Sequence, residues 1–275
     1  MEKTSRFRLH EITIHRMMEA ARSRLLEIPH AISWKFSTYA QLNKSRIQQF
    51  QNIHVNERCF IVANGPSLNK TDLRLIENEI SFGVNRIYLN FSSSSFRPTY
   101  YVAVNELVLQ QFSNEITNLP MPKFLNWNQR KCFDKSITNL VYLKTKLVIS
   151  DSFQKDLTHS MVFGATVTFV ALQLAFYMGF KKVILVGLDH NFTDKGTPNT
   201  TELRKTDLDL SHFDKQYFPK GTKWQLPDLT RSDLDYGIAR KIFEQNGREI
   251  VDATIDGKCT IFPKVEYSSL FSRLG

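Results

Sequence analysis

Short apolar runs alternate with polar segments that contain glycine or proline from residue 59 to the end of the chain. Runs of this length, apolar at nearly every position, are typical of strands buried on both faces of a parallel sheet. They predict strands in CFIVA (59–63), ISFGV (80–84), TYYVAV (99–104), KFLNW (123–127), LVYLK (140–144), KKVILVGLD (181–189) and EIVDAT (249–254).

Segments with helical character lie between these runs. They are NKTDLRLIEN (69–78), ELVLQQFSNEI (106–116), ATVTFVALQLAFY (165–177) and DLTRSDLDYGIARKIFEQNG (228–247). The third is apolar almost all round and is followed by Gly179, so we expect a central helix that ends there, and Gly247 should cap the fourth. The alternation predicts an α/β fold with a single doubly wound, mostly parallel sheet.

Residues 1–55 and 190–230 depart from this alternation. The first segment predicts a basic, amphipathic helical arm broken at Pro29, which either packs on the domain or on a second subunit, or lies on an anionic membrane surface through residues 1–50. The second is long, polar and rich in Asp, Lys, Thr and Pro. Loops of this length are usually lids or binding segments, so we expect residues 56–275 to form a nucleotide-binding domain with a lid.

Asparagine follows three of the predicted strands, at Asn64, Asn85 and Asn105. Ligands of parallel α/β sheets bind at the carboxyl ends of the strands. An asparagine there can donate and accept hydrogen bonds without carrying charge, which suits phosphate, ribose or a base edge. A single asparagine could simply cap a turn, but three in equivalent places predict a shared crevice.

The first strand runs into Asn-Gly-Pro-Ser, and this bend predicts a ligand cradle. Gly65 lets the backbone approach a ligand, Pro66 fixes the turn, and Ser67 offers a hydroxyl and the first amides of the next helix to an anion. The spacing matches neither the dinucleotide glycine fingerprint nor the Walker phosphate loop. Asp189 ends another strand, where it could bind ribose, a sugar or a metal, or could cap a loop or hold His190.

The charge balance narrows the class of partner. The 36 Lys and Arg residues against 27 Asp and Glu give a net charge of +9, which suits anionic partners. The basic residues form no stripe interleaved with aromatic residues, so we expect no nucleic acid. Cys59, Cys132 and Cys259 lack metal-ligand spacing and predict reduced thiols and no metal site. Without a signal peptide or a spanning run, a cytoplasmic protein is expected.

Four segments carry a family resemblance over residues 58–262. IVANGPSL, FGVNRIYL, YVAVN and ALQLAFYMGFKKVILVGLD resemble the Campylobacter-type bacterial sialyltransferases and the related family named after archaeal 6-hydroxymethylpterin pyrophosphokinase. The second family includes bacterial proteins of surface-polysaccharide clusters. The resemblance implies a Rossmann-like, GT-A-variant fold, a cytidine monophosphate donor contacted by Asn64, Asn85 and Asn105, a donor-site segment matching Gly164–Thr166, and no required cofactor.

The resemblance also implies a histidine base and two tyrosines on the leaving phosphate. Asn191 and the Gly196–Pro198 loop stand at the tyrosine positions, and the base position falls near Lys215–Tyr217. We therefore assign the base to His212 of the similar Ser-His-Phe segment, with His190 as the alternative, because a neutral imidazole can take a proton from a hydroxyl. Tyr217 of the lid could close over the donor.

Three functions remain open at this point. The first is inverting, metal-independent transfer from a nucleotide sugar, most simply a CMP-linked sialic-acid-like sugar, to a surface glycan. The second is ATP-dependent diphosphoryl transfer to a hydroxymethyl-dihydropterin, which would need Mg²⁺. The third is a nucleotide-binding protein without catalysis. The protein would work in the cytoplasm, as a peripheral protein at the inner face of the membrane if the arm binds lipid.

Overall fold

The computed structural model describes residues 14–146, 151–194 and 196–271. Two compact units are distinguished by their internal contacts, Met1–Lys44 and Ser45–Gly275. The first thirteen residues of the predicted arm lie outside the described residues, as do Leu147–Ser150, Lys195 and the last four residues.

The first unit holds α1 (Ile14–Phe36) and the start of α2 (Thr38–Gln48). The predicted break at Pro29 is wrong, because α1 runs through this residue and ends at Phe36. Proline removes the amide that would bond to the carbonyl four residues earlier. Leu25 and Pro29 are both exposed, so water can hydrate that carbonyl and the helix continues.

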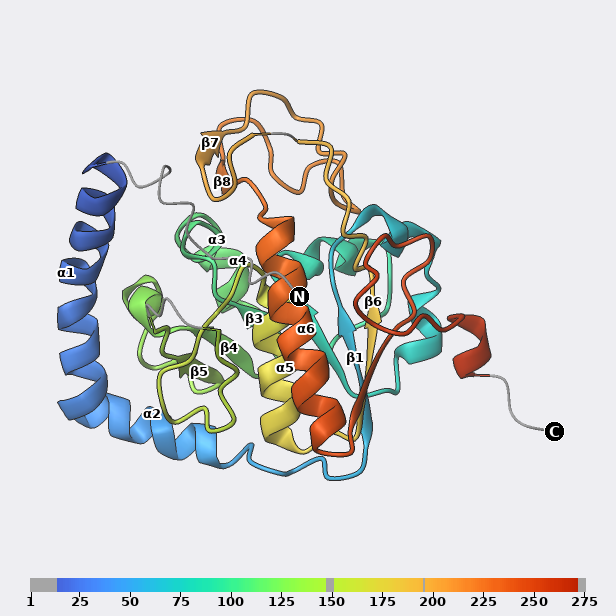
Figure 1. Ribbon diagram of the computed structural model, residues 1–275, viewed down its shortest axis with the longest axis horizontal. Coiled ribbons are helices and arrows are strands. Elements are labelled where there is room, and N and C mark those ends of the chain that lie inside the picture. The colour runs from blue at the N-terminus through green and yellow to red at the C-terminus, as the bar shows by residue number, and fades with distance from the viewer. Residues whose placement is uncertain (1–13, 147–150, 195, 272–275) are drawn as a thin grey trace, which may run out of the picture. The chain divides into compact units, whose positions relative to one another are not determined.

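Seven parallel strands form the centre of the second unit (Figure 1). They are β1 (Arg58–Val62), β2 (Ser81–Val84), β3 (Tyr100–Ala103), β4 (Lys123–Asn126), β5 (Leu140–Leu143), β6 (Lys182–Val186) and β9 (Glu249–Asp252). Their order is β5-β4-β3-β2-β1-β6-β9, and every pairing is parallel. The predicted doubly wound fold is confirmed, and the order reverses at β1, where α/β sheets place their ligands.

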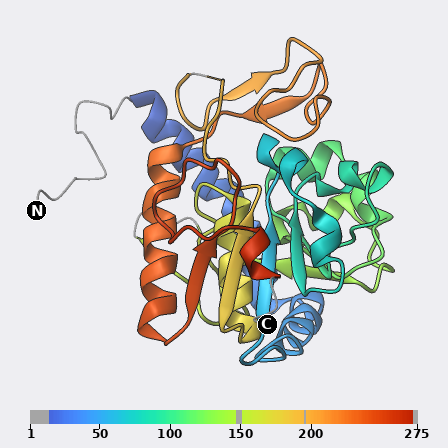
Figure 2. The same cartoon turned by 90° about the vertical axis from the view of Figure 1, so that its right-hand side faces the viewer.

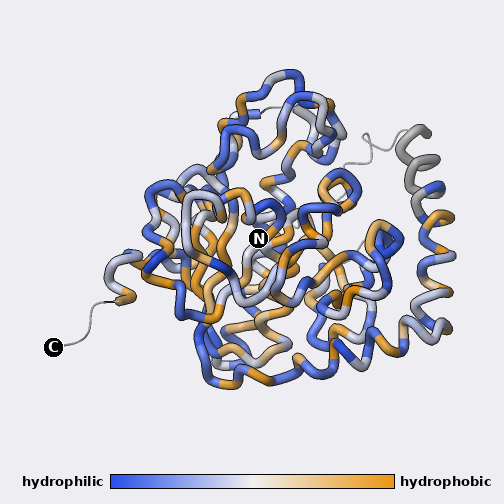
Figure 3. Tube along the Cα trace, turned by 180° about the vertical axis from the view of Figure 1, so that it is seen from behind, coloured by the Kyte–Doolittle hydropathy of each residue, from blue (hydrophilic) through white to orange (hydrophobic). Residues whose placement is uncertain are grey.

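Two helices account for much of the core. All but the first residue of α5 (Val167–Met178) are buried, and the helix packs against β1, β2 and β3, as its apolar sequence predicts. It ends at Gly179, whose φ of +98° is costly for a residue with a side chain. The longer α6 (Leu229–Gln245) packs on α5 and β9. Figure 3 shows the hydrophobic positions concentrated in this central part of the second unit.

The connections on the other half of the sheet are shorter and less regular than predicted. The helix expected over 69–78 is two 3-10 helices, η2 (Pro66–Lys70) and η3 (Leu73–Ile76), because Asp72 accepts the Arg74 amide and starts a new turn. The segment 106–116 forms two short helices that are separated at Phe112. The remaining short elements are α3 (Glu106–Gln111), α4 (Ser113–Thr117), η4 (Ile87–Ser92), η5 (Trp127–Cys132) and η6 (Ser268–Leu270).

The lid segment, residues 190–230, lies beyond the carboxyl ends of the strands (Figure 2). It contains a small antiparallel pair, β7 (Thr201–Leu203) and β8 (Lys223–Gln225). The side chain of Gln111 in α3 makes two hydrogen bonds with the backbone of Lys223 in β8. Its Nε2 donates to the Lys223 carbonyl at 2.8 Å, and its Oε1 accepts the Lys223 backbone amide at 2.7 Å. The lid segment is thus attached to the edge of the sheet where ligands are expected.

Neither a disulfide nor a membrane-spanning helix is found in the described ranges. Cys59 and Cys259 are buried thiols, and Cys132 is half-buried. No described helix is long and apolar enough to cross a bilayer.

Candidate active site

The strand-ending asparagines lie on neighbouring strands at one edge of the sheet. Asn64 Nδ2 donates to the Val84 carbonyl at the end of β2, at 2.9 Å. A fourth asparagine, Asn126, makes the equivalent bond from β4 to the Val104 carbonyl after β3, at 3.2 Å. Sequence reasoning missed Asn126, although it ends the KFLN run just as the others end theirs. Two of the four amides therefore bridge adjacent strand ends where the ladder of the sheet stops.

The side-chain carbonyl oxygens of Asn64 and Asn85 accept no hydrogen bond from the described residues. The Oδ1 atoms of both are enclosed and lack a hydrogen-bond partner within the described chain. Asn85 also has a φ of +45°, which asparagine tolerates better than most residues. Enclosed acceptors of this kind are costly unless something else binds them.

Asn105 has a structural task. Its Oδ1 accepts the Leu107 and Val108 amides at 2.9 and 3.2 Å and so caps α3, while its Nδ2 donates to Gln225 of β8 at 3.2 Å. The side chain is therefore engaged on both sides, unlike those of Asn64 and Asn85.

The bend after β1 is filled by Asp189 from the end of β6. The Ser67 amide and hydroxyl donate to this carboxylate at 3.0 and 2.6 Å. A Cβ at position 65 would lie 1.8 Å from Asp189 Oδ2, so the approach requires glycine. Burial raises the pKa of Asp189, and the Ser67 donors oppose that shift. The donors expected to attract an external anion thus hold an internal one, and Asp189 caps this loop instead of holding His190.

His212 is fixed by a buried carboxylate. Its Nδ1 lies 2.9 and 3.0 Å from the two oxygens of Asp209, and its ring stacks on Tyr217 with centroids 3.9 Å apart. Nε2 has no hydrogen-bond partner among the described residues. An imidazole that donates from Nδ1 to a carboxylate presents Nε2 as an acceptor. This arrangement is suited to taking a proton from a bound hydroxyl.

Asp209 stays charged although it is fully enclosed. Burial would raise its pKa, but hydrogen bonds from His212 and the Ser211 amide, with the nearby Arg204 guanidinium, bring the pKa below its ordinary value. Arg204 lies 3.3 Å from Asp209 and 2.8 Å from Asp194. Sequence reasoning missed Asp209, which stands three positions before His212.

Hydrogen bonds dock this part of the lid segment onto the ends of β1 and β2. The Phe213 amide donates to the Asn64 carbonyl at 2.9 Å, and Asn69 Nδ2 donates to the Phe213 carbonyl at 2.8 Å. The Tyr217 hydroxyl accepts the Arg86 amide at 3.2 Å. His212 therefore lies beside the loops that carry Asn64 and Asn85. Burial raises the pKa of Tyr217, so its phenol is neutral.

Arg86 brings a buried positive charge to the same place. Its guanidinium lies 3.8 Å from the Phe112 ring centroid and donates to the Tyr217 carbonyl, and its Nε donates to the Tyr88 hydroxyl at 3.2 Å. No carboxylate of the described chain pairs with it, and Nη2 has no partner there. Buried charges are normally paired, so an unpaired one beside a strand end suits an anionic ligand. In the sequence, the only indication of a role for Arg86 was its position directly after Asn85 at the end of a predicted strand.

The other predicted residues form a second group around the start of α6. His190 Nε2 lies 2.9 Å from Asp233, and its ring faces Tyr236 at 6.0 Å. Thr166 caps α5 and shares a 3.0 Å hydrogen bond with Tyr236. Gly164 has a φ of +68°, and a Cβ there would lie 2.4 Å from Asp235 Oδ2. These three residues thus lie against α6. His212 instead stacks on Tyr217, whose hydroxyl accepts the Arg86 amide, and it precedes Phe213, whose amide donates to Asn64.

No group of three or more His, Cys, Asp or Glu side chains that could hold a metal is found among the described residues.

Comparison with known proteins identifies the family. The family model for 6-hydroxymethylpterin diphosphokinase MptE-like proteins matches residues 36–195, more than half of the 275 residues. The chain belongs to the MptE-like family. The match begins in α1, before the predicted resemblance, and ends within the lid segment. The predicted relationship to the pterin-enzyme family is thus confirmed, while the specific likeness to sialyltransferases stays a prediction.

One solved structure is similar to this chain in fold. The MptE-like chain is similar to the MAf glycosyltransferase from Magnetospirillum magneticum AMB-1, with 13% identity and a TM-score of 0.51 over 86% of this chain. It spans only 39% of the length of that structure. At this identity the similarity shows a shared fold. None of the curated proteins matches the sequence.

Proposed function

We propose that this MptE-like protein transfers a sugar from a nucleotide-sugar donor to a hydroxyl of a glycan, with inversion and without a metal. The observation that carries the proposal is the Asp209–His212 pair, whose free Nε2 stands beside the ends of β1 and β2. The donor we favour is a CMP-linked sialic-acid-like sugar or another eight- or nine-carbon acidic sugar. The reaction would occur in the cytoplasm, during surface-glycan synthesis.

In the proposed step, His212 acts as the general base and Asp209 positions it. The acceptor hydroxyl loses its proton to Nε2 of His212 while its oxygen forms a bond to the anomeric carbon. The bond between that carbon and the phosphate oxygen breaks, and the nucleotide monophosphate leaves with the electron pair. Asp209 stabilises the imidazolium that results, because its carboxylate is already bonded to Nδ1.

Arg86 is the group that we expect to stabilise the leaving phosphate. The tyrosines that the sialyltransferase resemblance implies are missing, so another source of positive potential is needed. A guanidinium held in a low-dielectric site interacts with developing negative charge more strongly than one in water. Arg86 is 6% exposed and keeps Nη2 free of partners within the described chain, which fits this role.

Asn64 and Asn85 would bind the donor through their enclosed acceptors. Amide oxygens of this kind can accept from ribose hydroxyls or from an exocyclic amino group such as that of cytosine. The Phe213 amide and the Arg86–Tyr217 contacts cover these residues, so donor entry would require the lid segment to move.

The family name supports a second candidate, ATP-dependent diphosphoryl transfer. That chemistry ordinarily uses Mg²⁺ held by carboxylates and phosphates. Glu106, which follows Asn105, is exposed at the start of α3 and could contribute one carboxylate. A nucleotide-binding protein without catalysis is the third candidate.

Ligand-dependent thermal stability separates the three candidates. CMP, CDP, UDP, GDP and ATP would each be added with and without Mg²⁺. We expect CMP to raise the melting temperature without metal, because a ligand at 100 times its Kd stabilises the folded state by about 2.7 kcal/mol. Stabilisation by ATP with Mg²⁺ alone would instead favour diphosphoryl transfer. Stabilisation by a nucleotide without consumption of any nucleotide sugar would favour the non-catalytic reading.

A further inference from the structure

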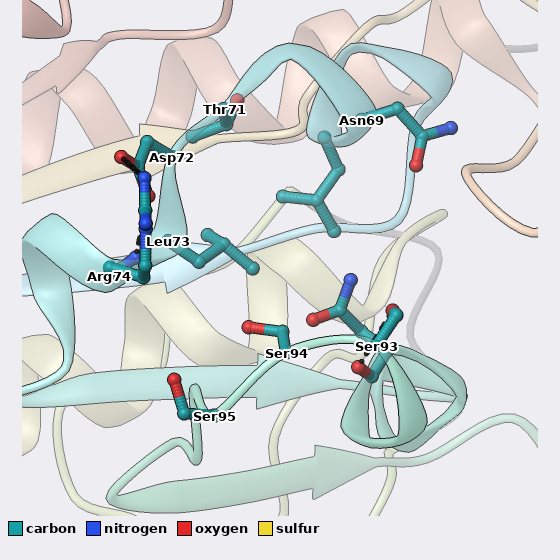
Figure 4. Close-up of a pocket in the computed structure, with 10 residues that line it drawn as sticks. Asn69, Thr71, Asp72, Leu73, Arg74, Ser93, Ser94 and Ser95 are labelled. Carbon is teal, nitrogen blue, oxygen red and sulfur yellow. Dashed lines mark hydrogen bonds and ion pairs between the residues drawn. The ribbon is translucent and has the colours of Figure 1, made fainter.

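A polar cavity lies beside the docked part of the lid segment (Figure 4). Its volume is about 340 Å³, and its walls come from η2, η3, η4 and the serine run 93–95. The buried residues Leu68 and Leu73 contribute its apolar surface. Ser93–Ser95 thus face a cavity large enough for a single sugar unit.

The charges on the cavity wall are already neutralised. Arg74 Nε and Nη2 donate to the two carboxylate oxygens of Asp72 at 2.9 and 2.8 Å. What remains for a ligand is a set of uncharged groups: the amide of Asn90, Oδ1 of Asn69 and the hydroxyl oxygens of Ser93–Ser95. The Ser93 and Ser95 hydroxyls already donate to the Asn90 carbonyl and to Glu77, so their oxygens serve chiefly as acceptors. Phosphate would find no unpaired cation in this lining. A neutral polyol would find both donors and acceptors for its hydroxyls, and leucine surface for its C–H groups.

Asn90 points most directly to such a ligand. Its side-chain amide makes no hydrogen bond within the described chain, and its Oδ1 is enclosed. A half-buried amide that lacks partners is unfavourable, whereas a hydroxyl could accept from Nδ2 and, once seated there, donate to Oδ1. The other amide of the lining, Asn69, is held by its bond to the Phe213 carbonyl.

That bond connects the cavity to the proposed base. Asn69 lines the cavity, and Phe213 directly follows His212, so one wall of the cavity is attached to the segment that positions the imidazole. A sugar seated in the cavity would lie beside this segment. Arg86, which we propose to bind the leaving phosphate, does not line this cavity; its guanidinium contacts Phe112 and Tyr217.

We propose that this cavity is the acceptor subsite and that it binds an uncharged sugar unit of the acceptor glycan. The proposal rests on the proposed function and deepens it by giving the acceptor a chemical class. Acidic sugars would bind less well here, because Arg74 is already paired with Asp72.

Binding of free sugars to the full-length protein tests the subsite. Glucose, galactose, N-acetylglucosamine and N-acetylgalactosamine would be compared with N-acetylneuraminic acid by saturation-transfer NMR. We expect at least one neutral sugar to bind and Asn90→Leu to weaken it about tenfold or more. Asn78→Leu makes the same change at an exposed position outside the cavity and should leave binding unchanged.

Two outcomes would overturn the subsite: no saturation transfer from any neutral sugar, or equal transfer in the two asparagine variants. If Asn90→Leu does not fold, Ser93→Trp, which puts bulk into the cavity from an exposed position, replaces it and should abolish sugar binding. Nucleotide stabilisation reports on the proposed function separately. Sugar binding that depends on Asn90 in a protein that no nucleotide stabilises would keep the cavity as a sugar-binding site and would reject the transferase, and with it the role of the cavity as an acceptor subsite.

Discussion

His212 and His190 are both held by an aspartate, but they differ in what surrounds them. His212 stacks on Tyr217 within the segment that bonds to Asn64 and Asn69, whereas His190 faces Asp233 and Tyr236 of α6. A general base must be within hydrogen-bond reach of the proton that it takes. At the residue scale, the structure therefore favours His212 by its neighbours.

Replacing each histidine in turn tests this assignment. We expect His212→Ala to lower the turnover of a nucleotide-sugar donor by about 10²–10⁴-fold, the usual contribution of a general base, and His190→Ala to keep most of the activity. The measurement is CMP release from CMP-sialic acid, with melting temperatures to show that both variants fold. Intact turnover in His212→Ala together with loss in His190→Ala would reverse the assignment.

Asp209 predicts how stability responds to acid. Its pKa in the folded chain lies below the ordinary value of about 3.9, so its stabilising effect is complete above that value and is lost as the pH falls through the folded pKa. Asp209→Asn leaves His212 and Arg204 without their shared carboxylate, which should cost about 3 kcal/mol of unfolding free energy at pH 7.

Urea unfolding at pH 7, 5 and 3 measures this effect. The difference between the wild-type protein and Asp209→Asn should be similar at pH 7 and 5 and should shrink at pH 3, where the wild-type carboxylate begins to be protonated. Asp207→Asn, an exposed neighbour, serves as the control and should change little at any pH. A difference that stays constant down to pH 3 would contradict the lowered pKa.

At the scale of elements, the strands and α5 could be predicted because burial dictates their sequence. A strand covered on both faces must be apolar throughout, and a helix such as α5, surrounded by β1–β3 and α6, must be apolar all round. The short helices after β1 and β2 could not be predicted in the same way. Their limits depend on local bonds such as that from the Arg74 amide to Asp72, which periodicity does not reveal.

The candidate site was predictable only in part, for a related reason. The positions of Asn64, Asn85 and Asp189 follow from where strands end, so the sequence located the edge of the sheet correctly. Which atoms remain free there depends on long-range partners: Ser67 is engaged by Asp189 and Asn105 caps its own helix. Arg86 was overlooked because an arginine after a strand is an ordinary surface residue until Phe112 and Tyr217 cover it.

At the scale of the whole molecule, the net charge of +9 and an exposed apolar stripe on the arm both favour contact with an anionic surface. In the described part of α1, Leu25, Ile28, Ile32 and Phe36 are each at least 50% exposed and recur at helical spacing along one stripe. Arg22 and Arg24 are exposed nearby. Apolar side chains flanked by cations bind anionic membrane surfaces through burial and charge together. We therefore expect the arm to attach the protein to anionic lipid.

Vesicle sedimentation decides this last prediction. Vesicles with about a third anionic lipid should sediment the wild-type protein, and binding should fall several-fold for the double variant Ile28→Glu with Ile32→Glu, or when ionic strength is raised, since salt screens the attraction. Leu234→Glu, at an exposed apolar position of α6, controls for the added negative charge. Equal sedimentation of the arm variant and this control would leave packing against the domain or a second subunit as the role of the stripe. A salt-sensitive loss confined to the arm variant would show that the exposed stripe binds an anionic membrane surface, where the proposed glycan transfer would then take place.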